Sequence, residues 1–204
     1  NADLLKKNQN IFRTKNRKDY TFPPPNKTLC DLVVENNRSC HAIGKIADIF
    51  SNRGISTSVS GLSDDALFYK MIDVIKKAKN GDLIFANFVE FDSLYGHRRD
   101  VAGFAAALER FDLKLVKLLE IINPNDFLII TADHGNDPTF KGTDHTREKV
   151  PVLMVGNYAQ KGNNGNIVFS DVGATMAAFH NLSGKLKGTN IFNDNNKLEK
   201  KCKT

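Results

Sequence analysis

The sequence predicts an α/β fold with a mostly parallel sheet flanked by helices. Two observations lead to this prediction. Short apolar runs of the length of a buried strand alternate with segments whose apolar residues recur at helical spacing. The apolar share of 41% and the charged share of 25% are ordinary for a globular protein, and 204 residues suffice for one main domain.

The first regular elements are a short helix around residues 29–33 and a short strand at residues 40–43. Apolar residues between positions 67 and 75 then recur at helical spacing. Ser63 and the two aspartates that follow it predict the N-terminal cap of this helix. Gly81, preceded by an asparagine, predicts its end.

Three strands and a long helix are expected farther along the chain. Residues 83–91 form a nearly continuous apolar run, which predicts a strand buried on both faces. Residues 104–122 predict a long amphipathic helix, and residues 127–131 and 150–155 predict two more buried strands. In folds of this kind, ligands gather at the carboxyl ends of the strands.

The net charge is +6, and Lys and Arg are dense in residues 6–18 and 197–203. This balance favours anionic ligands, but no nucleic-acid motif accompanies it, so no nucleic-acid partner is expected. No apolar run approaches the ~20 residues that cross a bilayer, and the first residues lack a signal-peptide pattern. A cytoplasmic protein without a membrane partner is therefore expected. Cys30, Cys40 and Cys202 are expected to be free thiols.

Carboxylate and imidazole side chains follow two of the predicted strands and precede a third. These are Asp92 and His97, then Asp133 and His134, then His145. Imidazole and carboxylate suit zinc, manganese or iron, and a binuclear site needs about five to seven such ligands. The set predicts a metal site. The alternative is that Asp133 caps a helix and that each histidine is a satisfied surface or core residue.

Adjacent residues of a regular strand point to opposite faces, so Asp133 and His134 could not share a metal ion within a strand. Gly135 follows them and permits a sharp turn, at which two successive side chains can converge.

Several segments resemble the phosphopentomutases of the alkaline phosphatase superfamily. The most specific are Asp-His-Gly-Asn-Asp-Pro-Thr at 133–139, Gly-Thr-Asp-His-Thr-Arg-Glu at 142–148 and Gly-His-Arg-Arg-Asp at 96–100. Segments 13–20 and 42–50 also match, and the likeness runs from about Phe12 to Phe192. The resemblance implies an alkaline-phosphatase-like core into which a cap domain is inserted.

By this resemblance, Asp92, His97 and His145 hold one of two manganese ions, and Asp133 and His134 hold the other. The family completes the second ion with an aspartate and a phosphorylated threonine from an N-terminal half that has no counterpart here. No catalytic nucleophile is therefore expected in this chain, which is expected to be incomplete and inactive by itself.

The domain boundaries also follow from the resemblance. Residues 1–24 are expected to be the C-terminal end of the cap domain, residues 25–195 the second portion of the metal-binding core, and residues 196–204 a basic tail. The three prolines at positions 23–25 are expected to form part of a hinge between cap and core.

The implied activity is that of an isomerase that moves phosphate between C1 and C5 of ribose or deoxyribose. A sugar bisphosphate such as glucose 1,6-bisphosphate primes the threonine in this family. Arg13, Arg17 and Lys45 are expected to bind the sugar phosphate, although such basic residues can also be merely solvated. A monomer is expected. Two alternatives remain open: another phosphomonoesterase or phosphoglycerate mutase of the superfamily, or a non-catalytic fragment that binds metal or anions.

Roles are also expected for two arginines and two histidines outside the predicted ligand set. Arg98 and Arg99 follow a predicted ligand and are expected to steady the metal shell through acidic partners. His41 and His180 match no ligand segment and are expected to be structural.

Overall fold

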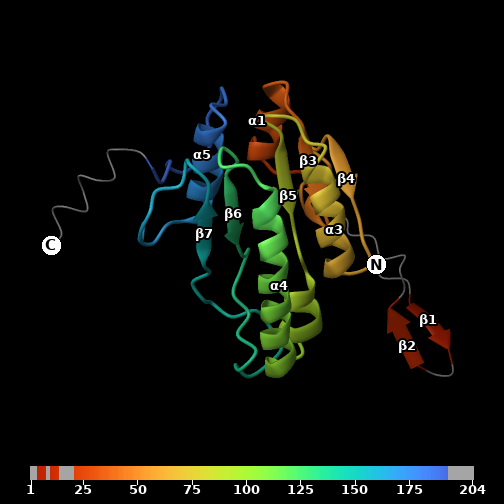
Figure 1. The fold of residues 1–204 in the computed structure, drawn as a ribbon. Helices are drawn as coiled ribbons and strands as arrows, with labels where there is room; N and C mark the ends of the chain where they lie inside the picture. The colour runs from red at the N-terminus through yellow and green to blue at the C-terminus, as the bar shows by residue number, and fades with distance from the viewer. Residues whose placement is uncertain (1–3, 8–9, 14–20, 193–204) are drawn as a thin grey trace.

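The structure is a computed structural model that describes residues 4–7, 10–13 and 21–192, the first two ranges as backbone only. Its main body has three layers, with helices on both sides of a layer of strands (Figure 1). The predicted α/β class is confirmed.

The strands form two separate groups in the main body. β3 (Cys40–Ile43) lies between β4 (Thr57–Val59) and β5 (Leu83–Ala86), and all three are parallel. β6 (Leu128–Thr131) pairs with β7 (Val152–Val155) in an antiparallel manner. The mostly parallel sheet is thus confirmed for the first group, whereas β7 runs against its neighbour.

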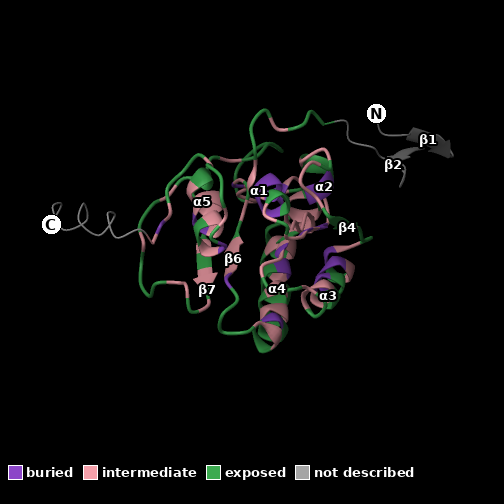
Figure 2. Cartoon of the chain, turned by 90° about the horizontal axis from the view of Figure 1, so that it is seen from above, coloured by how far each residue is buried: buried purple, intermediate pink, exposed green. Residues whose placement is uncertain are grey.

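Two helices, α3 (Asp64–Ile75) and α4 (Val101–Ile121), cover one face of the strand layer. Their apolar side chains pack with Ile43 around the fully buried Phe68. The other face carries α1 (Leu29–Glu35), α2 (Ile46–Ile49) and α5 (Phe169–Phe179). Figure 2, seen from above, shows these two sets of helices on opposite sides. The residues of β3 pack on both faces of the strand layer, because successive side chains of a strand point to opposite faces. Ile43 packs with α3 and α4, and Cys40 packs with α1 on the other face.

Polar side chains begin the longer helices. Ser63 accepts a hydrogen bond from the backbone N–H of Ala66, which confirms the predicted cap of α3. Asp100 caps α4 by accepting from the N–H of Gly103. α3 ends at Ile75, before the predicted stop at Gly81.

The prediction of one long strand over residues 83–91 is wrong. β5 stops at Ala86, and Phe91–Gly96 forms the π-helix η1. The predicted burial on both faces is wrong as well, since Phe85, Leu153 and Val155 are exposed.

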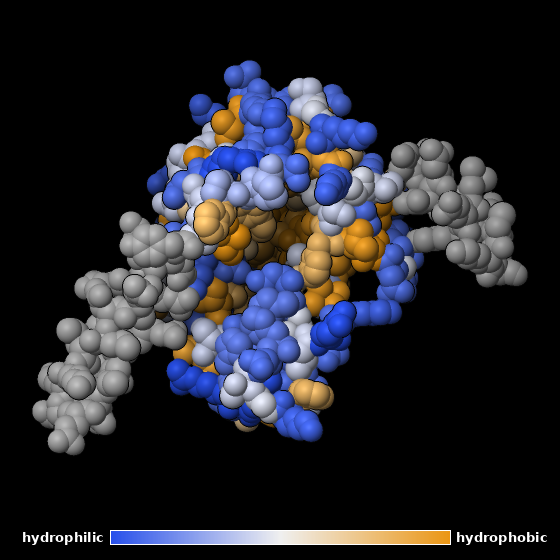
Figure 3. Space-filling view, turned by 180° about the vertical axis from the view of Figure 1, so that it is seen from behind, coloured by the Kyte–Doolittle hydropathy of each residue, from blue (hydrophilic) through white to orange (hydrophobic). Residues whose placement is uncertain are grey.

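Figure 3 shows a hollow lined by apolar side chains on the face turned away in Figure 1.

The N-terminal residues contain a hairpin of two strands, β1 (Leu4–Lys7) and β2 (Asn10–Arg13). The assignment of residues 1–24 to the C-terminal end of a cap domain stays a prediction. Arg53 donates to the carbonyls of Pro24 and Asn26 and to the carboxylate of Asp31, so it ties the proline stretch to α1. The predicted tail at 196–204 lies outside the described residues.

No helix in the described ranges has both the length and the apolar character needed to cross a membrane.

Candidate metal centre

The strand pairing explains why three distant segments meet at one end of the molecule. The end of β6 pairs with the start of β7, as Thr131 opposite Val152. The chain that leaves β6 and the chain that enters β7 therefore lie side by side. The segment after β5 reaches the same end, the lower one in Figure 1. This arrangement confirms the expectation that the polar segments gather at the carboxyl ends of β5 and β6.

The π-helix η1 places Asp92 against His97. The backbone N–H of His97 donates to the carbonyl of Asp92, five residues earlier, at 2.9 Å. The His97 Nε2 atom lies 3.0 Å from Asp92 Oδ2. In an α-helix, residues five apart are separated by roughly 140° around the axis, so the wider turn is needed for this contact.

His145 joins this pair from the loop before β7. Its Nε2 atom lies 3.3 Å from Asp92 Oδ1. The candidate ligand atoms of Asp92, His97 and His145 all lie within 4.8 Å of one another. These are the three residues that the resemblance assigned to one ion.

The second pair lies directly beside the first set. The His134 ring stacks on the His145 ring with centroids 3.7 Å apart, and the His97 ring also stacks on His145, with centroids 4.8 Å apart. Asp133 Oδ1 lies 3.6 Å from His134 Nε2, so the two successive side chains do converge. The structure therefore groups Asp92, His97 and His145, sets His134 against His145, and places Asp133 beside His134.

Gly135 contributes to this convergence in a way that differs from the prediction. It is not among the residues with positive φ, so it makes no left-handed turn. Instead, it is buried and forms a bridge with Thr146, and an added Cβ would lie 2.8 Å from the Thr146 carbonyl oxygen. The missing side chain lets the segment of His145 approach that of His134.

The donor atoms fit a cation. The Thr143 carbonyl, which can only accept, lies 2.5 Å from His97 Nδ1, so this nitrogen carries the proton. In the neutral imidazole, the lone pair of Nε2 then faces the Asp92 carboxylate. Two acceptors held together in this way need a proton or a metal ion between them. The side chain of His145 is 45% exposed, so an ion can reach the site from solvent.

Asn136 is a site residue that was not predicted from the sequence. Its Nδ2 atom donates to Asp92 Oδ1 at 2.6 Å, and its Oδ1 atom accepts from Arg99. The only signal in the sequence was its place within the matched segment after His134. Arg99 donates its side-chain hydrogen bonds to carbonyl and amide oxygens. Hydrogen bonds from Thr139, and then the positive charge of Arg99, lower the pKa of Asp137. Arg98 is exposed, and the expectation that it steadies the metal shell through an acidic partner stays a prediction.

Of the three predicted substrate-binding residues, the structure describes the side chain of Lys45. Lys45 is half-buried at the start of α2, directly after the end of β3, and so lies at the ligand-binding end of the parallel strands. Gly44 before it has φ +76°, and an added Cβ would lie 2.4 Å from the Asn87 carbonyl oxygen. Arg13 ends β2, where only the backbone is described, and Arg17 lies outside the described residues.

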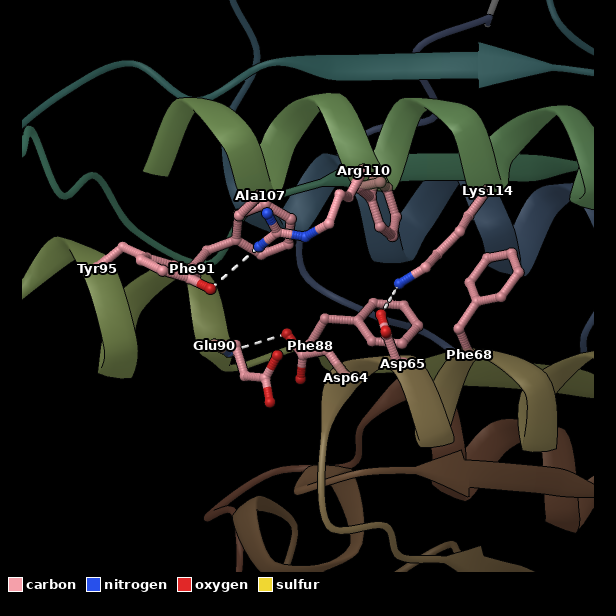
Figure 4. A pocket seen from close by; sticks show the side chains of 11 residues that line it. Asp64, Asp65, Phe68, Phe88, Glu90, Phe91, Tyr95, Ala107, Arg110 and Lys114 are labelled. Atoms are coloured by element: carbon pink, nitrogen blue, oxygen red, sulfur yellow. Dashed lines mark hydrogen bonds and ion pairs between the residues drawn. The ribbon is translucent and has the colours of Figure 1, made fainter. Parts of the chain in front are cut away.

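Asp64, at the start of α3, supports the segment that leads to η1. Its carboxylate accepts from the backbone N–H groups of Val89 and Glu90 at 3.0 and 2.9 Å. Burial raises the pKa of Asp64, against the opposing effect of these two donors. Figure 4 shows Asp64 and Glu90 at the edge of a cavity of about 30 Å³. This volume is far below the ~300 Å³ of a small ligand pocket, so it does not serve as a substrate site.

The two remaining histidines lie outside this site. His41 contacts Thr57 and Asp82, and His180 is buried against Arg38. Both contacts belong to the packing of the sheet and helices, as expected.

Imidazoles and carboxylates that converge at the carboxyl ends of strands in an α/β fold define the class as an α/β metalloenzyme. A sequence model of the Metalloenzyme superfamily matches residues 35–184. The chain belongs to this superfamily.

Curated proteins that resemble the chain carry the name phosphopentomutase. One from Legionella pneumophila (strain Corby) is 50% identical over 175 residues, which are 85% of this chain and 43% of that protein. One from Allorhizobium ampelinum is 49% identical over 170 residues, 83% of this chain and 42% of that protein. One from Sinorhizobium medicae is 51% identical over 167 residues, 81% and 41% respectively. The chain spans less than half the length of these relatives.

Proposed function

We propose that the protein to which this chain belongs is a phosphopentomutase, which interconverts ribose or deoxyribose 1-phosphate and 5-phosphate. The observation that carries this proposal is the convergence of Asp92, His97 and His145, with ligand atoms within 4.8 Å, in a chain about half identical to phosphopentomutases. A site of this composition suits phosphoryl transfer, which depends on positioning and on stabilisation of charge on the phosphoryl oxygens.

Under this proposal, Asp92, His97 and His145 hold one manganese ion, and Asp133 and His134 contribute to a second. Bound manganese ions would polarise the phosphoryl oxygens and neutralise their charge. The residues of this chain orient that site: the Thr143 carbonyl sets the tautomer of His97, and Asn136 fixes the Asp92 carboxylate. The nucleophilic threonine, and the other ligands of the second ion, lie outside this chain.

Lys45, Arg13 and Arg17 are proposed to bind the sugar phosphate. The position of Lys45 at the end of β3 supports its role, because anionic ligands of α/β proteins bind at this end of the strands. A sugar bisphosphate such as glucose 1,6-bisphosphate is proposed as the activator that phosphorylates the threonine.

The test is to assay the protein at its natural length for conversion of ribose 1-phosphate to ribose 5-phosphate, with manganese and with a chelator. His145→Ala removes a predicted ligand, and we expect activity to fall by at least about 100-fold because second-shell changes alone cost up to this much. Lys149→Ala, in the same exposed loop, is the matched control and is expected to retain activity.

Free inorganic phosphate is measured in the same reactions. Release of phosphate in place of ribose 5-phosphate would identify a phosphomonoesterase and refute the mutase proposal. Full activity of His145→Ala would refute the site assignment.

A further inference from the structure

Arg99 lies two residues after a predicted metal ligand, and its side chain donates hydrogen bonds to neutral oxygens only. We propose that Arg99 is a positioning residue that holds the three ligand-bearing segments together and orients Asp92 through Asn136. This inference rests on the proposed function only in that the site binds manganese.

The backbone of Arg99 has a conformation that few residues other than glycine adopt, with φ +54°. Such a conformation persists only where the surrounding structure holds it in place. Arg99 N–H donates to the Gly96 carbonyl at 3.1 Å, which closes a tight turn after η1. The turn directs the half-buried side chain back toward the ligand segments.

The guanidinium group reaches five acceptors in three parts of the chain. They are the carbonyls of Gly96 (3.1 Å), Asp137 (3.0 Å), Gly142 and Asp144 (2.6 Å), and the amide oxygen of Asn136 (2.6 Å). A planar guanidinium suits acceptors spread in this way, with the two Nη1 hydrogens shared among Gly96, Asn136 and Asp137, whereas a single ammonium group does not.

Each of these acceptors is next to a predicted ligand or close to one. Gly96 directly precedes His97, Asn136 lies two residues after His134, and Asp144 directly precedes His145. The guanidinium therefore links the segments after β5 and β6 with the loop before β7. Because those segments are far apart in sequence, their relative position depends on cross-links of this kind.

Asn136 connects the guanidinium of Arg99 to the carboxylate of Asp92 through two hydrogen bonds. Its Oδ1 atom must accept from Arg99, so its NH₂ group is left to donate to Asp92 Oδ1. Without Arg99, the Oδ1 end of the amide would lose the donor that fixes its position, and the Nδ2 end would be held to Asp92 less firmly. The carboxylate, which only accepts, favours the same orientation, so Arg99 and Asp92 hold the amide from its two ends.

The packing around Asn136 leaves little freedom for other arrangements. An added Cβ on Gly96 would lie 2.4 Å from Asn136 Nδ2. The amide is held directly against η1, at the one position in that turn where no side chain stands between them.

Within the part of the chain that the structure describes, no carboxylate forms an ion pair with Arg99. Its hydrogen-bond partners are neutral oxygens, so it holds the ligand segments by the geometry of these bonds, while its charge acts on Asp137 as a weaker influence after the hydrogen bonds of Thr139. This distinguishes it from a residue that steadies the ligands through a salt bridge.

The test measures manganese affinity directly, by calorimetry and by the electron paramagnetic resonance signal of free Mn²⁺, on the protein at its natural length. We expect Arg99→Ala and Asn136→Ala each to weaken binding by about 10- to 100-fold, as removal of second-shell partners does. Because both act on Asp92 by one route, the double variant is expected to lose much less than the product of the two effects.

Arg99→Lys keeps the positive charge but removes the planar guanidinium group. This variant is expected to bind manganese as weakly as Arg99→Ala. Arg98→Ala is the matched control, since Arg98 is exposed and adjacent, and it is expected to leave affinity unchanged. Circular dichroism in chelator identifies the temperature range in which every variant is folded, and affinities are compared there.

Three outcomes would overturn the proposal: unchanged affinity in Asn136→Ala, full affinity in Arg99→Lys, or multiplicative effects in the double variant. If Arg99→Ala fails to fold, the Asn136→Ala and Arg99→Lys results still decide. A wild-type protein that binds no manganese would instead refute the proposed function, so the two failures are distinguishable.

Discussion

His180 shows how one side chain can couple stability to pH. It is 6% exposed, at the end of α5, and its Nδ1 atom lies 3.1 Å from Arg38 Nη1. Burial, and then the positive charge of Arg38, lower the pKa of His180 to about 4. The folded protein therefore holds this imidazole neutral under conditions in which an unfolded chain would protonate it.

We predict that the free energy of unfolding decreases between pH 6.5 and pH 4 through His180. Above pH 6.5, both states are neutral at this position. Below it, the unfolded state binds the proton first, and the difference grows to about 3 kcal/mol near pH 4. Urea unfolding of the wild type and His180→Gln at pH 7.5 and 4.5 tests this. The glutamine variant should lose about 2 to 3 kcal/mol less over this interval. Equal losses would contradict the assignment.

At the scale of elements, the π-helix η1 depends on support from outside itself. Its first residues have no side-chain cap, and the backbone N–H groups of Val89 and Glu90 that precede it are bound by Asp64 of α3. Because Asp92 and His97 meet only in this wider turn, the start of α3 contributes to the site without touching a ligand.

Asp64→Ala is predicted to destabilise the protein by about 1 to 3 kcal/mol, since it leaves two backbone donors unpaired. The unfolding midpoint in urea measures this effect. Asp73→Ala changes an exposed aspartate on the same helix and is expected to stay within about 0.5 kcal/mol of the wild type. A similar effect of the two substitutions would show that the contact of Asp64 with the segment before η1 is unimportant.

At the scale of the whole molecule, the site is a junction of segments that belong to different strands. Asp92 follows β5, Asp133 and His134 follow β6, and His145 precedes β7. A metal ion bound there would link both strand groups, so its removal should affect the folded state as a whole.

We predict that manganese raises the melting temperature and that a chelator reverses the effect. An ion at 100 times its dissociation constant stabilises the folded state by about 2.7 kcal/mol, equivalent to a shift of about 5 to 10 °C for a chain of this size. Thermal unfolding by circular dichroism measures the shift. Asp92→Asn should remove most of it, and an equal shift in that variant would place the bound ion elsewhere.

Local patterns predicted many of the elements well. The strand at 40–43 and the Ser63 cap depend on neighbours in sequence, and both are confirmed. The prediction for 83–91 was wrong because apolar content does not distinguish a strand from a half-buried turn. The approach of Phe91 to Phe104 and Phe111 of α4 is a tertiary contact that periodicity does not reveal.

The sequence by itself determined which chemical groups this protein offers: three imidazoles and two carboxylates in segments that follow or precede strands, with the motifs of a known superfamily. Only the tertiary structure decided how they meet, through the π-turn of η1, the antiparallel β7, the side-chain-free Gly135 and the fork of Arg99. The physical reason is that ligand identity is a property of single residues. Convergence, by contrast, depends on distances between segments up to about fifty residues apart, which only packing and long-range hydrogen bonds determine.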